Sequence, residues 1–402
     1  MHFGHNNLEL SKSLHDKMSK IYIFQAIMIF VKGLIGVFVP VYLYKLGYSI
    51  IEVIIYTNLI LLTYLLFIPL SVKLIRKIGF KYVLFLSIPV YILHITTLNF
   101  LNSGILFYHL AWLSFGVYMA IFWLAMHSEI ALNGSSKHRS SQLGTLQIIT
   151  TIFATLAPIF GGFFLQYLGY YKLLIFSTFF LFLALLPLLF SKDLTLRNYD
   201  FNYSDYSRLF FSKKYDTSKK AFLAEGVEIL LSLNLWPVIL FILLKENFFN
   251  LGLLYSFISF LSIIFILYMK SYLDKKDKNE VLLISTRFMS MSWFFRSIII
   301  FFSSIALYFI ETFSKLVNNV YSLSYSSIFY NNAKNGEFMD YIILRELYIF
   351  IGKFIVSIFF IGIIYVYGSS LKVLLSLCLI GIIIPLGLNF LREDKKDETL
   401  EC

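Results

Sequence analysis

The chain of 402 residues is 59% hydrophobic and only 14% charged, whereas soluble domains carry about a quarter charged residues. This composition excludes an ordinary water-soluble domain, because so much apolar surface would aggregate in water, and it favours a polytopic membrane protein. The formal net charge of +11 could point to nucleic acid, but the positions of the basic residues indicate another role.

Apolar runs bounded by polar segments predict about twelve membrane-spanning helices, because a helix needs roughly 20 apolar residues to cross the bilayer core. The predicted spans are residues 21–44, 50–72, 82–101, 105–131, 142–168, 173–190, 221–244, 249–270, 281–300, 303–329, 340–366 and 371–391. Two arginines interrupt the ninth span, an acid and a lysine interrupt the tenth, and no polar turn separates the two. A count of eleven helices is therefore the alternative.

Lysines and arginines follow the predicted topology. With both termini placed inside, 24 of the 34 basic residues fall in cytoplasmic segments and only four fall in outer loops. This asymmetry satisfies the positive-inside rule, so the basic residues set the orientation and no nucleic-acid partner is expected. We expect a multi-pass protein of the inner (plasma) membrane with both termini in the cytoplasm.

Neither the start of the sequence nor its cysteines indicate processing or a cofactor. The first twenty residues are polar and contain three lysines, so we expect no cleavable signal peptide. Cys378 and Cys402 are the only cysteines, which supports neither a disulfide framework nor a metal cluster. We therefore expect no cofactor.

A repeat divides the chain into two related halves. Residues 191–220 are the only long polar stretch in the middle of the chain, and a shift of about 198 residues places the fourth predicted helix on the tenth. The sixth and twelfth helices are both almost wholly apolar. The sequence therefore predicts an all-α integral membrane protein with two pseudo-symmetric six-helix bundles. Its predicted parts are a cytoplasmic tail (1–20), a first bundle (21–190), a cytoplasmic linker (191–220), a second bundle (221–391) and a cytoplasmic tail (392–402).

Two short segments resemble motifs of the major facilitator superfamily. Residues 72–81, between the second and third spans, resemble its Gly-x-Leu-Ala-Asp-Arg-x-Gly-Arg-Arg loop; Gly79 and two basic positions match, whereas Arg76 stands where the family has aspartate. Residues 157–162 are similar to its Gly-Pro-x-x-Gly-Gly element, with Ala157 in place of the first glycine. The resemblance implies a secondary transporter, a symporter or an antiporter, that moves a small solute by alternating access as a monomer.

In this family the first, fourth, seventh and tenth helices line a central cavity, so polar residues deep in the spans are candidates for solute binding. These candidates are Lys32, His109, Trp112, Asn234, Lys315, Asn318 and Lys353. Glu228 and Glu311 are candidates for proton coupling, since burial favours the neutral form of a carboxyl group. Three lysines near the midplane against few acids indicate an organic anion or a phosphorylated solute.

One face of the tenth predicted helix carries most of its polar residues. The residues recur at spacings of 4, 3, 4 and 3, which places them on the same side of a helix: Glu311, Lys315, Asn318, Ser322 and Tyr325. Glu311 precedes Lys315 by four residues, the favourable order for an ion pair within one helix. We therefore expect these two side chains to pair.

Four charged loop residues are candidates for a cytoplasmic gate. The repeat makes Arg76 equivalent to Asp274, and Arg139 equivalent to Glu337, with the charges exchanged. The family fold brings each of these loops close to the opposite bundle, so the resemblance implies that Arg76 pairs with Glu337 and Asp274 with Arg139. The alternative is that all four are solvated loop charges.

Two other functions stay open on the sequence alone, and a third is not favoured. A twelve-helix flippase for lipid-linked saccharides has the same helix count, and a membrane receptor without transport activity has a similar composition. An enzyme is not expected, because the outer loops are short and the sequence contains no His–Asp constellation or phosphate-binding glycine loop.

Overall fold

The computed structural model describes residue 20 and residues 23–133, 139–190, 199–273, 276–335 and 338–393, and these residues form helices and connecting turns without a strand. Internal contacts divide the chain into two compact units. Unit 1 is Met1–Glu129, Leu146–Asp205 and Leu233–Ile263, and unit 2 is Ile130–Thr145, Tyr206–Ser232 and Ile264–Cys402. The two units alternate along the chain, so the predicted boundary at residues 191–220 stays a prediction.

The helices reproduce the predicted spans to within a few residues. The first span is Ile23–Lys45, which ends in α2 (Val39–Lys45). The following helices are α3 (Ile50–Asn99), α4 (Ile105–Asn133), α5 (Arg139–Phe163), α6 (Tyr170–Leu189), α7 (Asp205–Phe211), α8 (Asp216–Ile229), α9 (Trp236–Leu243), α10 (Phe248–Leu273), α11 (Lys278–Ser297), α12 (Ser304–Asn335), α13 (Phe338–Tyr367), α14 (Leu371–Leu377) and α15 (Ile384–Gly387). A π-helical turn, Leu230–Leu235, joins α8 to α9, and α14 and α15 together form the last span.

Helix α3 contains two predicted spans. It begins at a capping box, in which the hydroxyl of Ser49 accepts from the backbone N–H of Glu52 while the Glu52 carboxylate accepts from the N–H of Ser49. Gly79 then adopts φ 84° and ψ 166°, which breaks the helix between the two spans. Such a backbone conformation is readily accessible only to glycine, which explains why the loop motif keeps this residue.

The ninth and tenth spans are separate helices. Residues 298–303 lie between α11 and α12 and contain the short 3-10 turn Ile299–Phe301. In the described part of the chain, nine helical stretches are long and apolar enough to cross a membrane, with α3 counted once; α11 and α12 are not among them because of their polar residues. With α3 counted as two helices and α11 and α12 as one each, the described chain has twelve long helical segments, as predicted, and the two helices that the alternative of eleven would merge are separate.

Glycines allow close helix crossings in unit 1. A Cβ atom on Gly161 of α5 would lie 2.2 Å from the carbonyl oxygen of Leu34 in the first span. A Cβ atom on Gly252 of α10 would likewise lie 2.2 Å from the carbonyl oxygen of Pro158. Small residues permit such contacts between membrane helices. The Pro-x-x-Gly-Gly segment of α5 therefore acts as a packing element within this unit.

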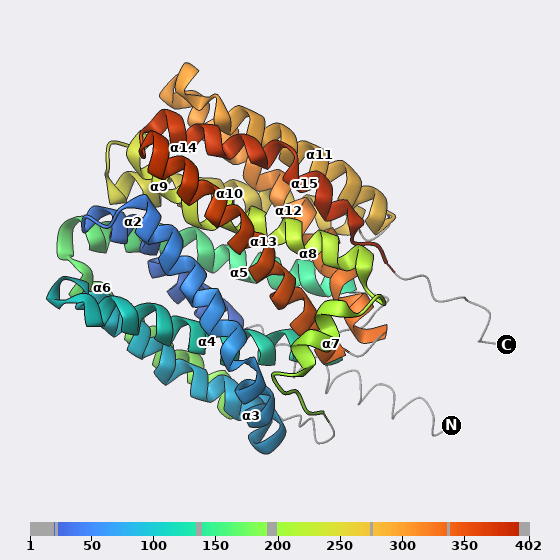
Figure 1. Cartoon of the computed structure of the whole chain (residues 1–402). Helices are drawn as coiled ribbons and strands as arrows, with labels where there is room; N and C mark the ends of the chain where they lie inside the picture. The colour runs from blue at the N-terminus through green and yellow to red at the C-terminus, as the bar shows by residue number, and fades with distance from the viewer. Residues whose placement is uncertain are drawn as a thin grey trace. The chain divides into compact units, whose positions relative to one another are not determined.

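Unit 2 has a comparable crossing between α8 and α13, which lie side by side (Figure 1). A Cβ atom on Gly226 of α8 would lie 2.1 Å from the carbonyl oxygen of Ile349, and one on Gly352 of α13 would lie 2.1 Å from that of Leu223. The two glycines bring the backbones together from both sides. The side chains that flank them are consequently held in register across the two helices.

We expect Gly352→Ala to lower the free energy of unfolding by about 1–3 kcal/mol, because the added methyl group meets a backbone carbonyl and forces the helices apart. The matched control is Gly362→Ala on the same helix, where a Cβ atom would meet nothing within 4 Å. Thermal unfolding of both variants in detergent measures the difference. Equal melting temperatures for the two variants would contradict the close crossing.

Candidate functional site

Lys32 lies in the first span with its ammonium group enclosed by aromatic rings of α4. The Nζ atom is 3.7 Å from the ring centre of Phe122, 4.3 Å from that of Trp123 and 5.5 Å from that of Tyr118. It is buried, and within the described chain it forms neither a hydrogen bond nor an ion pair. The rings are thus its only partners in this structure, and we call this group the Lys32 cage.

Further rings support the cage from behind. Tyr118 stacks on Phe122 with ring centres 5.2 Å apart, and Tyr91 of α3 packs on Tyr118 at 4.5 Å. His94 continues the cluster and is fixed by the carbonyl oxygen of Ala111, 2.9 Å from its Nδ1. The aromatic rings of α3 and α4 therefore form one packed cluster that ends at the buried amine of Lys32.

The aromatic rings of the Lys32 cage compensate only part of the free-energy cost of burying the lysine ammonium group. A desolvated cation over aromatic rings gains about 2 kcal/mol, whereas an ammonium group taken out of water loses several kcal/mol unless a carboxylate joins it. An anion that reached Nζ would provide the missing partner. Trp123 is half-buried, so a turn of this ring or of the lysine side chain would open a path to the amine.

His109 and Trp112 lie elsewhere on α4. The indole N–H of Trp112 donates to Nδ1 of His109 over 3.2 Å, and the His109 side chain is exposed. Eleven residues separate Trp112 from Trp123, which is about 17 Å along a helix. The structure therefore brings these two candidates together with each other, but not with the Lys32 cage.

Unit 2 contains a buried cluster of charges where α8, α12 and α13 meet. The guanidinium of Arg345 donates to both carboxylate oxygens of Glu225, with 3.0 Å from Nε to Oε2, and to Glu346 over 2.8 Å. The hydroxyl of Tyr325 donates to Glu225 over 2.8 Å. The guanidinium of Arg345 thus binds two carboxylates, and the hydroxyl of Tyr325 donates a further hydrogen bond to one of them, Glu225.

A second chain of polar contacts links α8, α11 and α12. Arg296 donates from Nε and Nη2 to the two oxygens of Glu311, each over 2.8 Å, and its guanidinium lies 4.7 Å from the ring centre of Trp293. The indole N–H of Trp293 donates to the carboxylate of Glu228 at 2.9 and 3.2 Å. Glu228 is buried and forms no ion pair with any described residue.

The expected ion pair between Glu311 and Lys315 is not formed. Glu311 is held by Arg296 instead, from a different helix, because a planar guanidinium can satisfy both carboxylate oxygens at once. Lys315 is half-buried and has no hydrogen bond or ion pair among the described residues. Asn318, one turn further along α12, is exposed.

The remaining candidates, Asn234 and Lys353, lie in the seventh and eleventh predicted spans. Asn234 is in the π-helical turn before Pro237, where its Oδ1 atom is buried without a hydrogen-bond donor in the described chain. Such turns often occur at functional sites, and Pro237 favours one because it cannot donate a helical hydrogen bond. Lys353 is buried on α13, next to the close crossing at Gly226.

The site residues predicted from the sequence do not include most of those that hold these networks together, although Tyr325 lies on the predicted polar face of the tenth helix. The others are Glu225, Trp293, Arg296, Arg345 and Glu346. A usable signal was present, because an adjacent arginine and glutamate inside an otherwise apolar stretch, as in α13, are costly unless buried partners meet them.

The predicted gate is only partly within the described chain. Asp274 and Glu337 lie outside the described residues, and so does the side chain of Arg139. Arg76 lies within α3 and pairs with Asp200 over 3.3 Å, with both side chains nearly half exposed. The pairs Arg76–Glu337 and Asp274–Arg139 therefore stay a prediction.

Comparison with solved structures identifies the fold. The E. coli fucose:proton symporter FucP superimposes with a TM-score of 0.63 at 12% identity, over 94% of this chain and 99% of that one. The human organic anion transporter MFSD10 gives 0.64 at 11% identity (92% and 99%), and a bacterial homologue of the iron transporter ferroportin gives 0.64 at 11% identity (94% and 99%). No family model and no curated protein matches the sequence.

These observations define a multi-pass helical membrane protein with ion pairs buried among its helices. Its fold is shared with FucP, a transporter of the major facilitator superfamily, as the loop and helix motifs predicted. The identities are too low to carry more than the fold from those proteins to this chain.

We expect Arg296→Met to lower the free energy of unfolding by about 3–5 kcal/mol, because it leaves the Glu311 carboxylate buried without its partner. The double variant Arg296→Met/Glu311→Leu should recover much of this loss, since it removes both charges. Thermal unfolding of the two single variants and the double variant gives the coupling free energy.

The matched control is Lys45→Met, which removes an ion pair with Glu246 whose side chains are 47% and 44% exposed. Exposed pairs contribute about 0–1 kcal/mol, so this variant should change little. Losses at Arg296 and Glu311 that simply add up in the double variant would contradict the proposed coupling.

Proposed function

We propose that this protein is a secondary transporter that moves an organic anion across the membrane by alternating access, coupled to protons. The fold supports a transporter, since the three neighbours named above are all transporters. Their solutes are fucose, organic anions and iron, so the fold alone does not select a solute. The choice of an anion rests on the lysines of this chain.

The observation that carries the proposal is the contrast between Arg296 and Arg345 on one side and Lys32 and Lys315 on the other. The two arginines bind carboxylates, which neutralise them. The two lysines bind none among the described residues. Cations inside the membrane are costly and usually mark a pathway or a ligand site, and an anionic solute bound at either lysine would reduce that cost.

Proton coupling is supported by the surroundings of Glu228. The carboxylate of Glu228 accepts from one neutral donor, the indole N–H of Trp293. In contrast, both carboxylate oxygens of Glu311 accept from the guanidinium of Arg296. Protonation of Glu311 would break a charge-assisted pair, while protonation of Glu228 would break only hydrogen bonds from a neutral group. Of the two candidates, Glu228 is therefore the better proton carrier.

This proposal treats the protein as a carrier rather than an enzyme, a receptor or a saccharide flippase. The described residues contain no cluster of three or more potential metal ligands. Catalytic acids would need access to substrate and solvent. The buried acids of unit 2 instead accept hydrogen bonds from Arg296, Arg345, Trp293 and Tyr325.

We expect organic anions to raise the melting temperature of the purified protein, and Lys32→Met and Lys315→Met each to remove this effect. The physical reason is that both variants delete a cation that lacks a protein partner. A thermal-shift screen with dicarboxylates, sugar phosphates and neutral sugars measures the stabilisation. Counterflow of the best anion in proteoliposomes then measures its uptake. Loss of at least about tenfold in uptake corresponds to roughly 1.4 kcal/mol.

Lys172→Met is the control, because Lys172 is exposed at the start of α6 and should leave uptake unchanged. Stabilisation by neutral sugars alone would contradict an anionic solute. So would anion uptake that is equal in the wild type and in both lysine variants.

We expect Glu228→Gln to abolish accumulation driven by a pH gradient while counterflow of the solute continues. Glutamine preserves the size of the side chain and an acceptor for Trp293, but it cannot carry a proton. Proteoliposomes with and without an imposed pH gradient separate the two activities. Glu52→Gln, at the exposed start of α3, serves as the control, and gradient-driven accumulation by Glu228→Gln at the wild-type level would contradict the role.

A further inference from the structure

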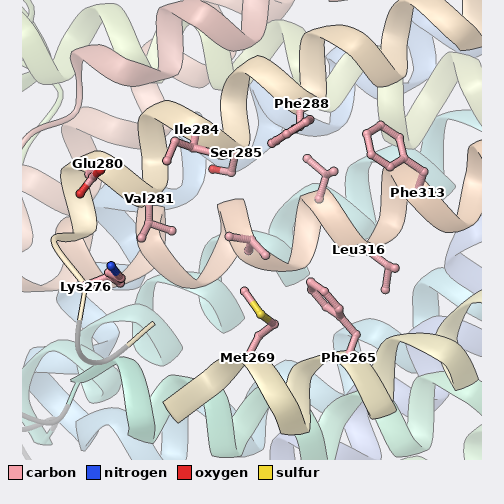
Figure 2. Close-up of a pocket in the computed structure, with 12 residues that line it drawn as sticks. Phe265, Met269, Lys276, Glu280, Val281, Ile284, Ser285, Phe288, Phe313 and Leu316 are labelled. Atoms are coloured by element: carbon pink, nitrogen blue, oxygen red, sulfur yellow. The ribbon is translucent and has the colours of Figure 1, made fainter. Parts of the chain in front are cut away.

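A groove in unit 2 lies apart from the buried charge networks. It runs between the second half of α10 and the facing sides of α11 and α12, and it encloses about 410 Å³ (Figure 2). This volume falls in the range of small-molecule sites, about 300–1,000 Å³. The groove is therefore large enough to hold a ligand.

The body of the groove is apolar. Phe265 and Met269 of α10 form one wall, Ile284 and Phe288 of α11 another, and Phe313 of α12 closes the far end (Figure 2). The hydroxyl of Ser285, which also lines the groove, donates to the carbonyl oxygen of Leu282 over 3.0 Å. No lining residue of this section offers a free polar group, so a hydrocarbon chain fits it better than a polar solute.

The groove opens on a flank of α11 that is mostly apolar but also exposes Arg287. Ile284 and Phe288 line it and are 45% and 46% exposed, and Met291 and Phe294 continue the exposed apolar surface along the helix. In a membrane-spanning helix such a flank meets acyl chains. An occupant would therefore enter sideways from the bilayer.

One end of the groove carries opposite charges. Lys276 precedes α11 and Glu280 lies in its first turn, after the N-cap residue Asp277, and both side chains lie at the same end in Figure 2. Residues 270–278, the segment expected on the cytoplasmic side, contain three more lysines and two aspartates. The groove thus combines a long apolar section with a charged end.

We propose that this groove binds a phosphatidylethanolamine molecule of the cytoplasmic leaflet, with one acyl chain along the apolar walls. Its phosphate would lie at Lys276 and its primary ammonium at Glu280. A headgroup with both charges complements this end better than an anionic headgroup, which would meet the Glu280 carboxylate. The phosphatidylethanolamine headgroup also complements this end better than that of phosphatidylcholine, whose trimethylammonium has no N–H to donate. The proposal is independent of the solute and of proton coupling.

Native mass spectrometry of the full-length protein, after delipidation in detergent, tests the site with three probes that share the same acyl chains. The probes are phosphatidylethanolamine, phosphatidylcholine and phosphatidylglycerol. We expect phosphatidylethanolamine to bind about tenfold more tightly than either of the others. Glu280→Gln should remove this preference, and Lys276→Met should weaken the binding of all three lipids.

A second variant tests the apolar section independently of the charges. Val317→Trp, on the α12 side of the groove, should fill it and abolish the tight lipid. Leu186→Trp on the exposed face of α6 is the matched control and should retain it. A single symmetric peak in size-exclusion chromatography qualifies each variant as folded.

Three results would overturn the proposal. The first is tighter binding of phosphatidylglycerol than of phosphatidylethanolamine, which would indicate a purely anionic site. The second is an unchanged preference in Glu280→Gln, and the third is an unchanged tight lipid in Val317→Trp.

Discussion

The structure depends on one constraint, which is that the bilayer core supplies no water to charged side chains. Every ionised group within a span must find a partner in the protein or remain costly. In unit 2 the carboxylates of Glu225, Glu311 and Glu346 meet this constraint through guanidinium groups, as in the bidentate contact between Arg296 and Glu311. Close backbone contact at Gly226 and Gly352 brings together α8 and α13, which carry Glu225 and Arg345.

Much of the fold could be predicted because hydrophobic length reports directly on membrane spans. The runs that became α4, α6, α10 and α13 are bounded by polar turns, and their limits differ from the prediction by only a few residues. The weak point was the boundary of α11 and α12, where charged residues such as Arg296 and Glu311 imitate a polar loop. These two residues belong inside the helices because they pair with each other across them, and a linear pattern does not contain that information.

The candidate site was predictable at the level of helix faces but not of partners. The polar stripe on α12 is real, yet Glu311 pairs with Arg296 rather than with Lys315. A pair within one helix contributes about 0.2–0.5 kcal/mol, and a buried bidentate contact with a neighbouring helix easily exceeds that. Similarly, Lys32 was predicted as a candidate from its depth in the first span, but its aromatic partners appear only when the fold places it over Phe122.

The different contacts of arginine and lysine in this protein follow from the chemistry of their side chains. A guanidinium is a rigid fork that matches a carboxylate and stays charged, which suits fixed contacts such as that of Arg345 with Glu225. A lysine amine is a compact charge on a flexible stem, so it can leave one partner for another. Lys32 rests on aromatic rings, which attract a cation without forming a permanent ion pair. A carrier needs partners of that kind, because a solute that replaced a carboxylate at every cycle would have to overcome the full strength of a buried salt bridge.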